Sequence, residues 1–226
     1  TSTQRNLSQS SIGYSPFGDC DKLRCVDVSE SNPKYKSEGG RLLYRNGDRF
    51  IYSESKVIRA NKNPITCVLL SSRTIGKTSL IQCLMGEKLT SIVTFGCRIY
   101  SYHATFKDKC VKFNVVDTSA QEKLRSIAYA HVKYAQFVLF VFGLTDRESL
   151  FGLEPIINEA NNEADPHYTR ILLGNEAEKA DRKVSPEEVE QFAEKFNLKY
   201  VEVSHITGQN LEELFKGFAE KVITEQ

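Results

Sequence analysis

The sequence lacks any apolar run near the ~20 residues that a helix needs to cross a bilayer. It also lacks a CxxC pair: its six cysteines are scattered, so a zinc site built from paired thiolates is not expected. Cysteines in apolar, strand-like contexts indicate free thiols, and we therefore expect an intracellular, cytoplasmic protein in a reducing compartment. An excess of charge of either sign is missing too, because 30 Lys and Arg face 29 Asp and Glu. This balance favours neither nucleic acid nor an anionic membrane surface as the partner.

Residues 1–38 begin with a stretch rich in serine, threonine, glutamine and asparagine, which predicts a flexible or irregular N-terminal arm. In residues 39–60, the segment GGRLLYRNGDRFIY places Asn46 and Gly47 between two short apolar and aromatic runs. Asn-Gly tolerates the positive φ of a tight turn, so this segment predicts a β-hairpin. Its paired glycines, NGD triplet and flanking aromatics resemble a single MORN repeat, which would favour a cytoskeletal or membrane-associated assembly. The alternative is an ordinary hairpin packed on the next domain.

From residue 65 onward, apolar β-prone runs alternate with helical segments. Six runs predict strands, at residues 65–70, 97–106, 111–116, 137–142, 170–173 and 200–203. Residues 78–85 predict a helix that stops at Gly86, and residues 185–188 (SPEE) form the capping box of another. This alternation predicts an α/β fold of three layers over residues 65–226, with a mostly parallel six-stranded sheet and about five helices. Loops at the carboxyl ends of the strands would then carry the ligand.

The segment directly after the first strand has the features of a phosphate-binding loop. It reads SSRTIGKT, so the strand is followed by a short loop and by GKT at the start of a helix. This is the context of the P-loop motif GxxxxGKS/T, although Ser71 stands at the position of the first glycine. Backbone amides and the helix N-terminus would hold the phosphates, Lys77 would contact the outer ones and Thr78 would ligate Mg²⁺. The predicted nucleotide contacts in this segment are Ser72, Arg73, Thr74, Ile75, Gly76, Lys77, Thr78 and Ser79.

Four further segments resemble motifs of the Ras superfamily and follow its order. VVDTSAQEKLRSI resembles the DTAGQE segment, and Thr94-Phe95-Gly96 resembles the switch I "TIG" of Rab proteins. LLGNEAE stands where the family carries GNKxD, and VSHITG stands where it carries its TSAK loop. Together with the P-loop, these segments make residues 65–226 similar to a Rab-type small GTPase with the three-layer P-loop NTPase fold. The resemblance implies binding of GTP or GDP together with Mg²⁺.

The resemblance also implies roles for single residues. Thr78, Thr94 and Asp117 would hold Mg²⁺, and Gln121 would be catalytic by orienting the attacking water. The remaining nucleotide contacts implied by the family are Ala120 near the γ-phosphate and, around the base, Asn175, Glu178, Ser204 and His205.

Several of these positions depart from the family pattern. Arg73 replaces a glycine that faces the reacting phosphate, where a guanidinium would crowd the attacking water and Gln121. Ala120 replaces the switch II glycine, and its Cβ narrows the backbone range of that switch. Both changes predict slow hydrolysis and a stiff switch. In LLGNEAE, the segment where the family binds the guanine base, Glu178 replaces an aspartate and Glu176 replaces a lysine. These changes predict weakened guanine binding.

Two functions stay open at the level of the sequence. The first is a guanine-nucleotide switch that hydrolyses GTP slowly. The second is a nucleotide-independent pseudo-GTPase that serves as a structural or adaptor subunit of a larger, cytoskeletal assembly. In both, protein partners are expected at the switch surface and at the N-terminal extension.

The surface used by Rab effectors and the lipid anchor of Rab proteins are both expected to be missing. Ile99, Val116 and His131 stand at the positions of the Rab aromatic triad, so ordinary Rab effectors are not expected to bind. The final segment EKVITEQ has no cysteine, so no prenyl anchor is expected there.

Overall fold

The structure is a computed structural model in which residues 63–89, 94–106, 109–164 and 168–225 are described in full. In the preceding part of the chain, only the backbone of six short strands is described. The chain divides into two compact units: Thr1–Arg59 with Lys107–Cys110, and Ala60–Phe106 with Val111–Gln226. The second unit carries all of the predicted nucleotide contacts.

The first unit consists of short strands. A parallel pair is formed by β1 (Thr3–Leu7) and β2 (Leu23–Val28). An antiparallel sheet is formed, in this order, by β3 (Tyr35–Glu38), β4 (Arg41–Tyr44) and β5 (Phe50–Tyr52). The sixth strand, β6 (Ile58–Arg59), pairs in parallel with Lys109 and Cys110 of the same unit.

The predicted hairpin at residues 39–60 coincides with the pair β4 and β5. These strands are antiparallel and flank Asn46 and Gly47, although the turn itself lies outside the described residues. Strands β1, β2 and β3 fall within residues 1–38, for which the sequence predicts a flexible or irregular arm. The boundaries of that arm and the MORN resemblance stay predictions.

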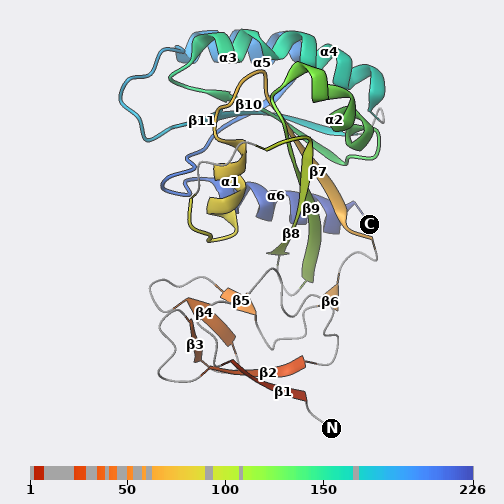
Figure 1. The fold of residues 1–226 in the computed structure, drawn as a ribbon, viewed down its shortest axis with the longest axis vertical. Coiled ribbons are helices and arrows are strands. Elements are labelled where there is room, and N and C mark those ends of the chain that lie inside the picture. The colour runs from red at the N-terminus through yellow and green to blue at the C-terminus, as the bar shows by residue number, and fades with distance from the viewer. Residues whose placement is uncertain are drawn as a thin grey trace. The chain divides into compact units, whose positions relative to one another are not determined.

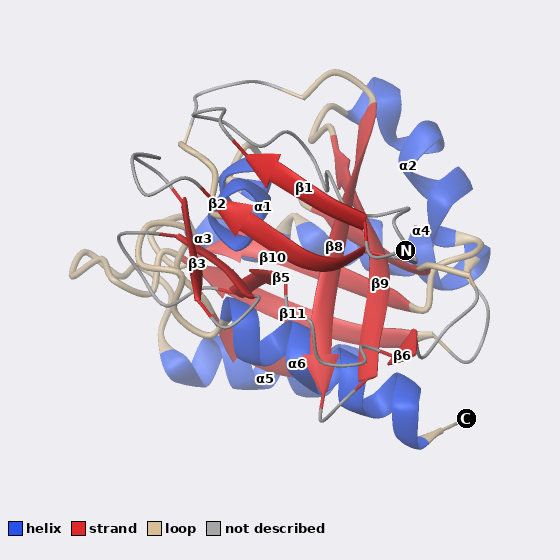
Figure 2. Ribbon diagram, turned by 90° about the horizontal axis from the view of Figure 1, so that it is seen from below, coloured by secondary structure: helices blue, strands red, loops and turns tan. Residues whose placement is uncertain are grey.

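A mostly parallel sheet forms the centre of the second unit. Strands β12, β11, β10, β7 and β9 lie side by side in that order and pair in parallel, and β8 pairs with β9. Figure 2 shows the two long strands β8 and β9 next to each other. The bounds are β7 (Ile65–Leu70), β8 (Cys97–Phe106), β9 (Lys109–Thr118), β10 (Phe137–Gly143), β11 (Thr169–Asn175) and β12 (Lys199–Glu202). The predicted six-stranded, mostly parallel sheet is confirmed.

Helices cover both faces of this sheet. One face packs against α1 and α6, and the other packs against α2, α3, α4 and α5 (Figure 1). The bounds are α1 (Lys77–Leu84), α2 (Arg125–Val132), α3 (Arg147–Phe151), α4 (Leu153–Glu163), α5 (Pro186–Phe196) and α6 (Leu211–Thr224), with a 3₁₀ turn at Glu122–Leu124. The prediction of about five helices is confirmed, since α3 and α4 are one helical segment interrupted at Gly152. Among the described residues, no helix has the length and apolar character to span a membrane.

The alternation of side chains along the strands explains the three layers. Every residue of β10 is buried. Val138 and Phe140 join the core beneath α2–α5, whereas Phe137 and Leu139 join the core beneath α1 and α6. The ring of Phe137 stacks on that of Phe218 in α6, with centroids 4.1 Å apart. Because both faces are covered, the loops at the carboxyl ends of the strands are the natural place for a ligand.

The predicted capping box begins α5. Ser185 Oγ accepts a hydrogen bond from the Glu188 backbone N–H at 3.2 Å, and Glu188 Oε2 accepts one from the Ser185 N–H at 3.0 Å. Pro186 takes the first helical position, where its missing N–H costs nothing.

Replacing Ser185 tests this cap. Ser185→Ala is expected to lower the free energy of unfolding by about 1 kcal/mol, because an amide of the first turn loses its acceptor. Urea denaturation measures the change. The control is Thr224→Ala at the exposed end of α6, where the hydroxyl donates to the Glu220 carbonyl at 2.9 Å and to the Lys221 carbonyl at 3.2 Å; it should change stability by less than about 0.5 kcal/mol. Equal losses in both variants would contradict a specific role for the cap.

Candidate functional site

The loop between β7 and α1 has the geometry of a phosphate-binding loop. Gly76 precedes α1 with φ of 82°, a left-handed conformation that favours glycine. A Cβ at this position would also stand 3.2 Å from Nδ2 of Asn175. Sequence and geometry therefore agree on a glycine here, directly before the helix N-terminus whose free amides attract anions. Of the other predicted contacts in the segment, Thr74 is exposed, while Ile75 and Ser79 are half-buried.

Lys77, the first residue of α1, is a buried cation with a partner inside the loop. Only 5% of the residue is exposed, and its Nζ donates a hydrogen bond to Oγ of Ser71. The Ser71 hydroxyl in turn donates to the Arg73 carbonyl at 2.8 Å. Burial lowers the pKa of Lys77 to about 8, and the nearby carboxylate of Asp117 partly opposes this shift.

Three residues predicted to hold a metal lie together. Oδ2 of Asp117, at the end of β9, accepts hydrogen bonds from the hydroxyls of Thr78 at 2.7 Å and Thr94 at 2.6 Å. The two hydroxyls are 2.8 Å from each other. Asp117 is fully buried, and its other oxygen, Oδ1, is buried without a hydrogen-bond partner among the described residues. A buried carboxylate oxygen with no donor is costly, and a bound cation would remove that cost.

The segment after β9 carries the residues predicted to act on the γ-phosphate. Its start is tied to switch I, because the Ser119 backbone N–H donates to the Gly96 carbonyl at 2.8 Å. The Gln121 backbone N–H donates to Oγ of Ser119 at 3.2 Å, and the residue is exposed. Ala120 is half-buried. Gln121 thus lies near the predicted site but has no hydrogen bond with Thr78, Thr94 or Asp117.

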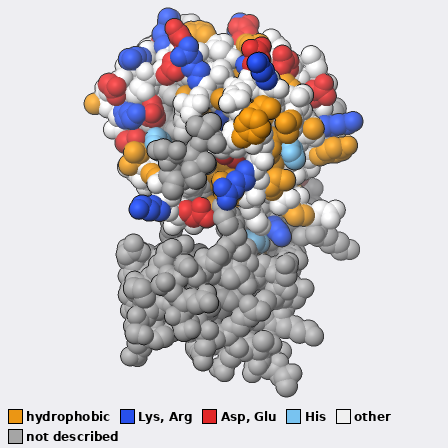
Figure 3. Space-filling model, viewed as in Figure 1, with side chains coloured by type: hydrophobic (Ala, Val, Ile, Leu, Met, Phe, Trp, Pro, Cys, Tyr) orange, Lys and Arg blue, Asp and Glu red, His pale blue; other side chains and the backbone are white. Residues whose placement is uncertain are grey.

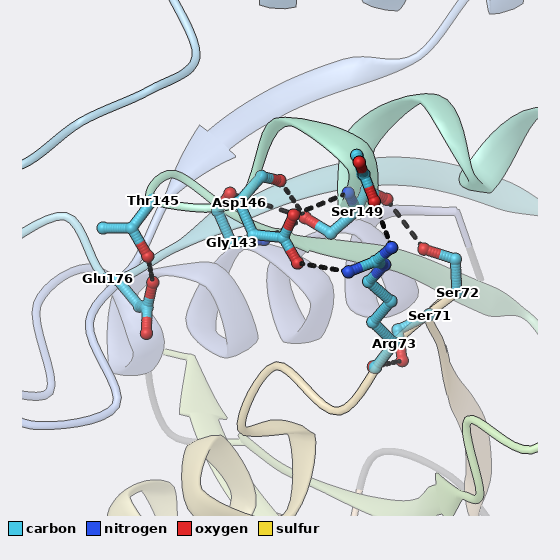
Figure 4. Close-up of polar contacts among 9 residues, drawn as sticks. Ser71, Ser72, Arg73, Gly143, Thr145, Asp146, Ser149 and Glu176 are labelled. Carbon is cyan, nitrogen blue, oxygen red and sulfur yellow. Dashed lines mark hydrogen bonds and ion pairs between the residues drawn. The ribbon is translucent and has the colours of Figure 1, made fainter.

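Arg73 is bound to α3 instead of extending freely from the loop. Its guanidinium forms ion pairs with Glu148 and, at 3.7 Å, with Asp146 (Figure 4). The crowding of Gln121 expected from the sequence would therefore require Arg73 to leave these carboxylates. Sequence reasoning missed both acidic residues, although Asp146 could have been found as the N-cap of α3 in the segment TDRES.

A second contact joins the P-loop to the same helix. Ser72 Oγ donates to the Ser149 carbonyl at 2.9 Å (Figure 4). The approach depends on Gly152, because a Cβ there would stand 2.8 Å from both Cβ and Oγ of Ser72. The glycine that interrupts α3 and α4 is therefore also the point where the P-loop packs against them.

Asn175, at the end of β11, connects the P-loop to the predicted base-binding loops. It is fully buried; its Nδ2 donates to the Ile75 carbonyl at 2.8 Å, and its Oδ1 accepts from the His205 N–H at 3.2 Å. Ser204 is also buried, and its Oγ accepts from the Thr207 N–H at 2.9 Å. The structure thus brings Asn175, Ser204 and His205 together, as the sequence predicts for one site.

The two glutamates of the base loop differ in their surroundings. Glu178 is exposed. Glu176 adopts φ of 72° and accepts a hydrogen bond from Thr145 (Figure 4) and another, at 2.6 Å, from Lys179. Partial burial would raise the pKa of Glu176, but the hydrogen bonds from Lys179 and Thr145 prevail and lower it. Thr145 was not predicted, because its contact with Glu176 joins two loops, and Lys179 was missed although it lies only three residues from Glu176.

Comparisons with known proteins agree with this geometry. The sequence profile of the Ras family matches residues 66–224. The chain is 30% identical over 159 residues to Ras-related protein Rab-2B of Dictyostelium discoideum, an alignment that covers 69% of this chain and 79% of that protein. It is 30% identical over 158 residues to RABF2a of Arabidopsis thaliana, covering 69% and 79%, and 30% identical over 167 residues to Rab5 of Nicotiana tabacum, covering 73% and 84%. The chain therefore belongs to the Ras family of small GTPases and resembles its Rab members.

Proposed function

We propose that this protein binds a guanine nucleotide with Mg²⁺ and hydrolyses GTP slowly, as a molecular switch. The observation that carries the proposal is the convergence of Thr78, Thr94 and Asp117 beside a P-loop whose lysine is in place. In the family these positions hold Mg²⁺, and Oδ1 of Asp117, which has no hydrogen-bond partner in the described part of the chain, fits that role.

The residues present fit a magnesium ion by their chemistry. Two hydroxyl oxygens and one carboxylate are oxygen donors, which Mg²⁺ prefers over nitrogen and sulfur. Mg²⁺, when bound, would neutralise negative charge on the phosphate oxygens. Thr78 comes from α1 and Thr94 from the segment before β8, so the cluster would also couple the ligand to switch I.

Three parts of the chain would hold the nucleotide. Lys77 and the amides at the start of α1 would bind the phosphates. Asn175 would keep the P-loop and the base loops in register through its bonds to Ile75 and His205. Glu178 would accept hydrogen bonds from the two edge donors of guanine, because it is the exposed carboxylate of the loop, whereas Glu176 is engaged with Thr145 and Lys179.

Slow hydrolysis follows from Arg73 and Ala120. Ion pairs of a half-exposed side chain are weak, at most about 1 kcal/mol, so Arg73 can exchange Glu148 for the phosphates. Beside the phosphates, the bulk of the Arg73 side chain would disturb the placement of the attacking water by Gln121. Ala120 would restrict the backbone that must bring its amide to the γ-phosphate.

The second candidate, a pseudo-GTPase that acts as an adaptor, is favoured by contacts that satisfy the site from within. The ammonium of Lys77 already donates a hydrogen bond to Ser71, and the carboxylate of Glu176 already accepts one from Lys179. Such a protein would keep the fold without needing a ligand. Nucleotide released from the natively purified, denatured protein distinguishes the two candidates.

We also propose that protein partners bind at the switch surface and at the N-terminal extension. Phe95 is 80% exposed, and Ile99 and Ile127 are about half exposed. Figure 3 shows hydrophobic side chains gathered on the face that α2 borders. Val116 is fully buried, so it cannot replace a Rab aromatic residue on this surface, and the partners should differ from ordinary Rab effectors.

Lys77→Ala should reduce the affinity for nucleotide at least tenfold, because a hydrogen bond from a charged group to phosphate contributes on the order of 1.5–3 kcal/mol. Titration with a fluorescent GTP analogue measures the loss. Lys199→Ala, on the exposed start of β12, is the control and should bind like the wild type. Unchanged binding by Lys77→Ala would remove Lys77 from the phosphate site.

The base should be read by Glu178. GTP is expected to displace the fluorescent analogue at least tenfold better than ATP or XTP, since xanthine presents an oxygen in place of the N2 donor of guanine. Glu178→Gln should lose most of this preference, because the NH₂ group of the glutamine amide would face an N–H donor of guanine. A wild-type site that does not distinguish GTP from ATP would refute the assignment and favour the adaptor.

Arg73→Gly is expected to raise the single-turnover rate of GTP hydrolysis at least tenfold, equivalent to about 1.4 kcal/mol of barrier. Adding Ala120→Gly should raise it further. The matched control is Glu148→Gln, which keeps Arg73 but removes its main ion-pair partner and should not accelerate hydrolysis. If the double variant stays at the rate of GTP in buffer while binding is confirmed, steric obstruction is not the cause.

A further inference from the structure

Ser71 differs from the glycine of the P-loop motif by a hydroxyl that is placed for one partner. The residue follows the last position of β7 and is 5% exposed. Its Oγ donates to the Arg73 carbonyl at 2.8 Å, so its lone pairs are left to accept. Nζ of Lys77 donates to that oxygen. A glycine at this position would give Lys77 no side-chain acceptor.

The ammonium of Lys77 needs such an acceptor. A buried cation without a hydrogen-bond partner is strongly unfavourable. The nearest carboxylate, Asp117, is already bonded through Oδ2 to the hydroxyls of Thr78 and Thr94, and no hydrogen bond joins it to Lys77. Ser71 is therefore the side chain that satisfies Lys77 from within the loop.

Neighbouring contacts fix the loop in this arrangement. Ser72 is bonded to the Ser149 carbonyl, and Arg73 is paired with Glu148 and Asp146 of the α3 segment. The residues on the C-terminal side of Ser71 are thus anchored to another helix. This anchoring holds the hydroxyl of Ser71 beside Lys77.

We propose that the hydroxyl of Ser71 competes with the nucleotide phosphates for Lys77, and thereby weakens nucleotide affinity while stabilising the protein after nucleotide leaves. The proposal rests on the proposed binding of a guanine nucleotide and adds a regulatory residue to that site. Phosphate oxygens must take the ammonium away from Ser71, so part of each new bond only replaces an existing one. Nucleotide release is correspondingly easier, because the Lys77 ammonium can again donate its hydrogen bond to the Ser71 hydroxyl.

The test compares wild type with Ser71→Ala, using a fluorescent GDP analogue and protein stripped of nucleotide by chelation and phosphatase. The variant should bind about tenfold more tightly and release the analogue more slowly, because an acceptor of a charged donor has been removed. Without nucleotide, its melting temperature should fall below that of the wild type. Ser101→Ala is the control, because the Ser101 hydroxyl is buried without a partner among the described residues; its removal should leave nucleotide binding unchanged and should not lower the melting temperature.

A double-mutant cycle of Ser71→Ala and Lys77→Met in the stripped protein measures the contact without any ligand. A positive coupling between the two side chains is expected. Weaker binding by Ser71→Ala would make Ser71 a phosphate ligand, and unchanged binding would make it merely structural; either result overturns the competition. If no variant binds nucleotide although the coupling is present, the proposed function fails, and the competition fails with it.

Discussion

A buried positive charge organises this site. Lys77 lies at the start of α1 with little exposure, and the chain must provide oxygen atoms around it because an isolated ammonium is not tolerated in the interior. Ser71 supplies the hydrogen bond and Asp117 the nearby negative charge. The same carboxylate gathers Thr78 and Thr94. The proposed phosphate site and the proposed metal site are therefore one electrostatic unit, built where β7, β9 and α1 meet.

The first three positions of the loop segment SSRTIGKT carry polar side chains, and each has a partner inside the protein. Ser71 bonds to Lys77, Ser72 to the Ser149 carbonyl and Arg73 to Glu148. In a loop of glycines these interactions cannot form, and the ligand would supply the missing partners. These contacts stabilise the loop from within the chain, which agrees with the proposals of weak nucleotide binding and of stability without ligand.

Most of the fold could be predicted because it depends on local patterns. Apolar runs of five to seven residues gave β7 and β10, and the SPEE segment gave the start of α5 through hydrogen bonds between near neighbours. The interruption between α3 and α4 was not predicted. It depends on Gly152, where a Cβ would be too close to the side chain of Ser72, a residue distant in sequence. The position of Arg73 was missed for the same reason: the motif placed its guanidinium beside the attacking water and Gln121, whereas in the folded chain it pairs with Glu148 and Asp146.

The sequence by itself determined the order of strands and helices in residues 65–226, the P-loop, and the choice of Thr78, Thr94 and Asp117 as candidate metal ligands. These features depend on motif spacing and side-chain periodicity, which can be read from the sequence. Only the tertiary structure decided which groups these side chains satisfy. It separated exposed Glu178 from Glu176, which is bound by Thr145 and Lys179, and it joined Asn175 to Ile75 and His205. The physical reason is that hydrogen bonds and ion pairs act over a few ångströms in space, and residues from separate loops reach that range only after the sheet has aligned the ends of its strands.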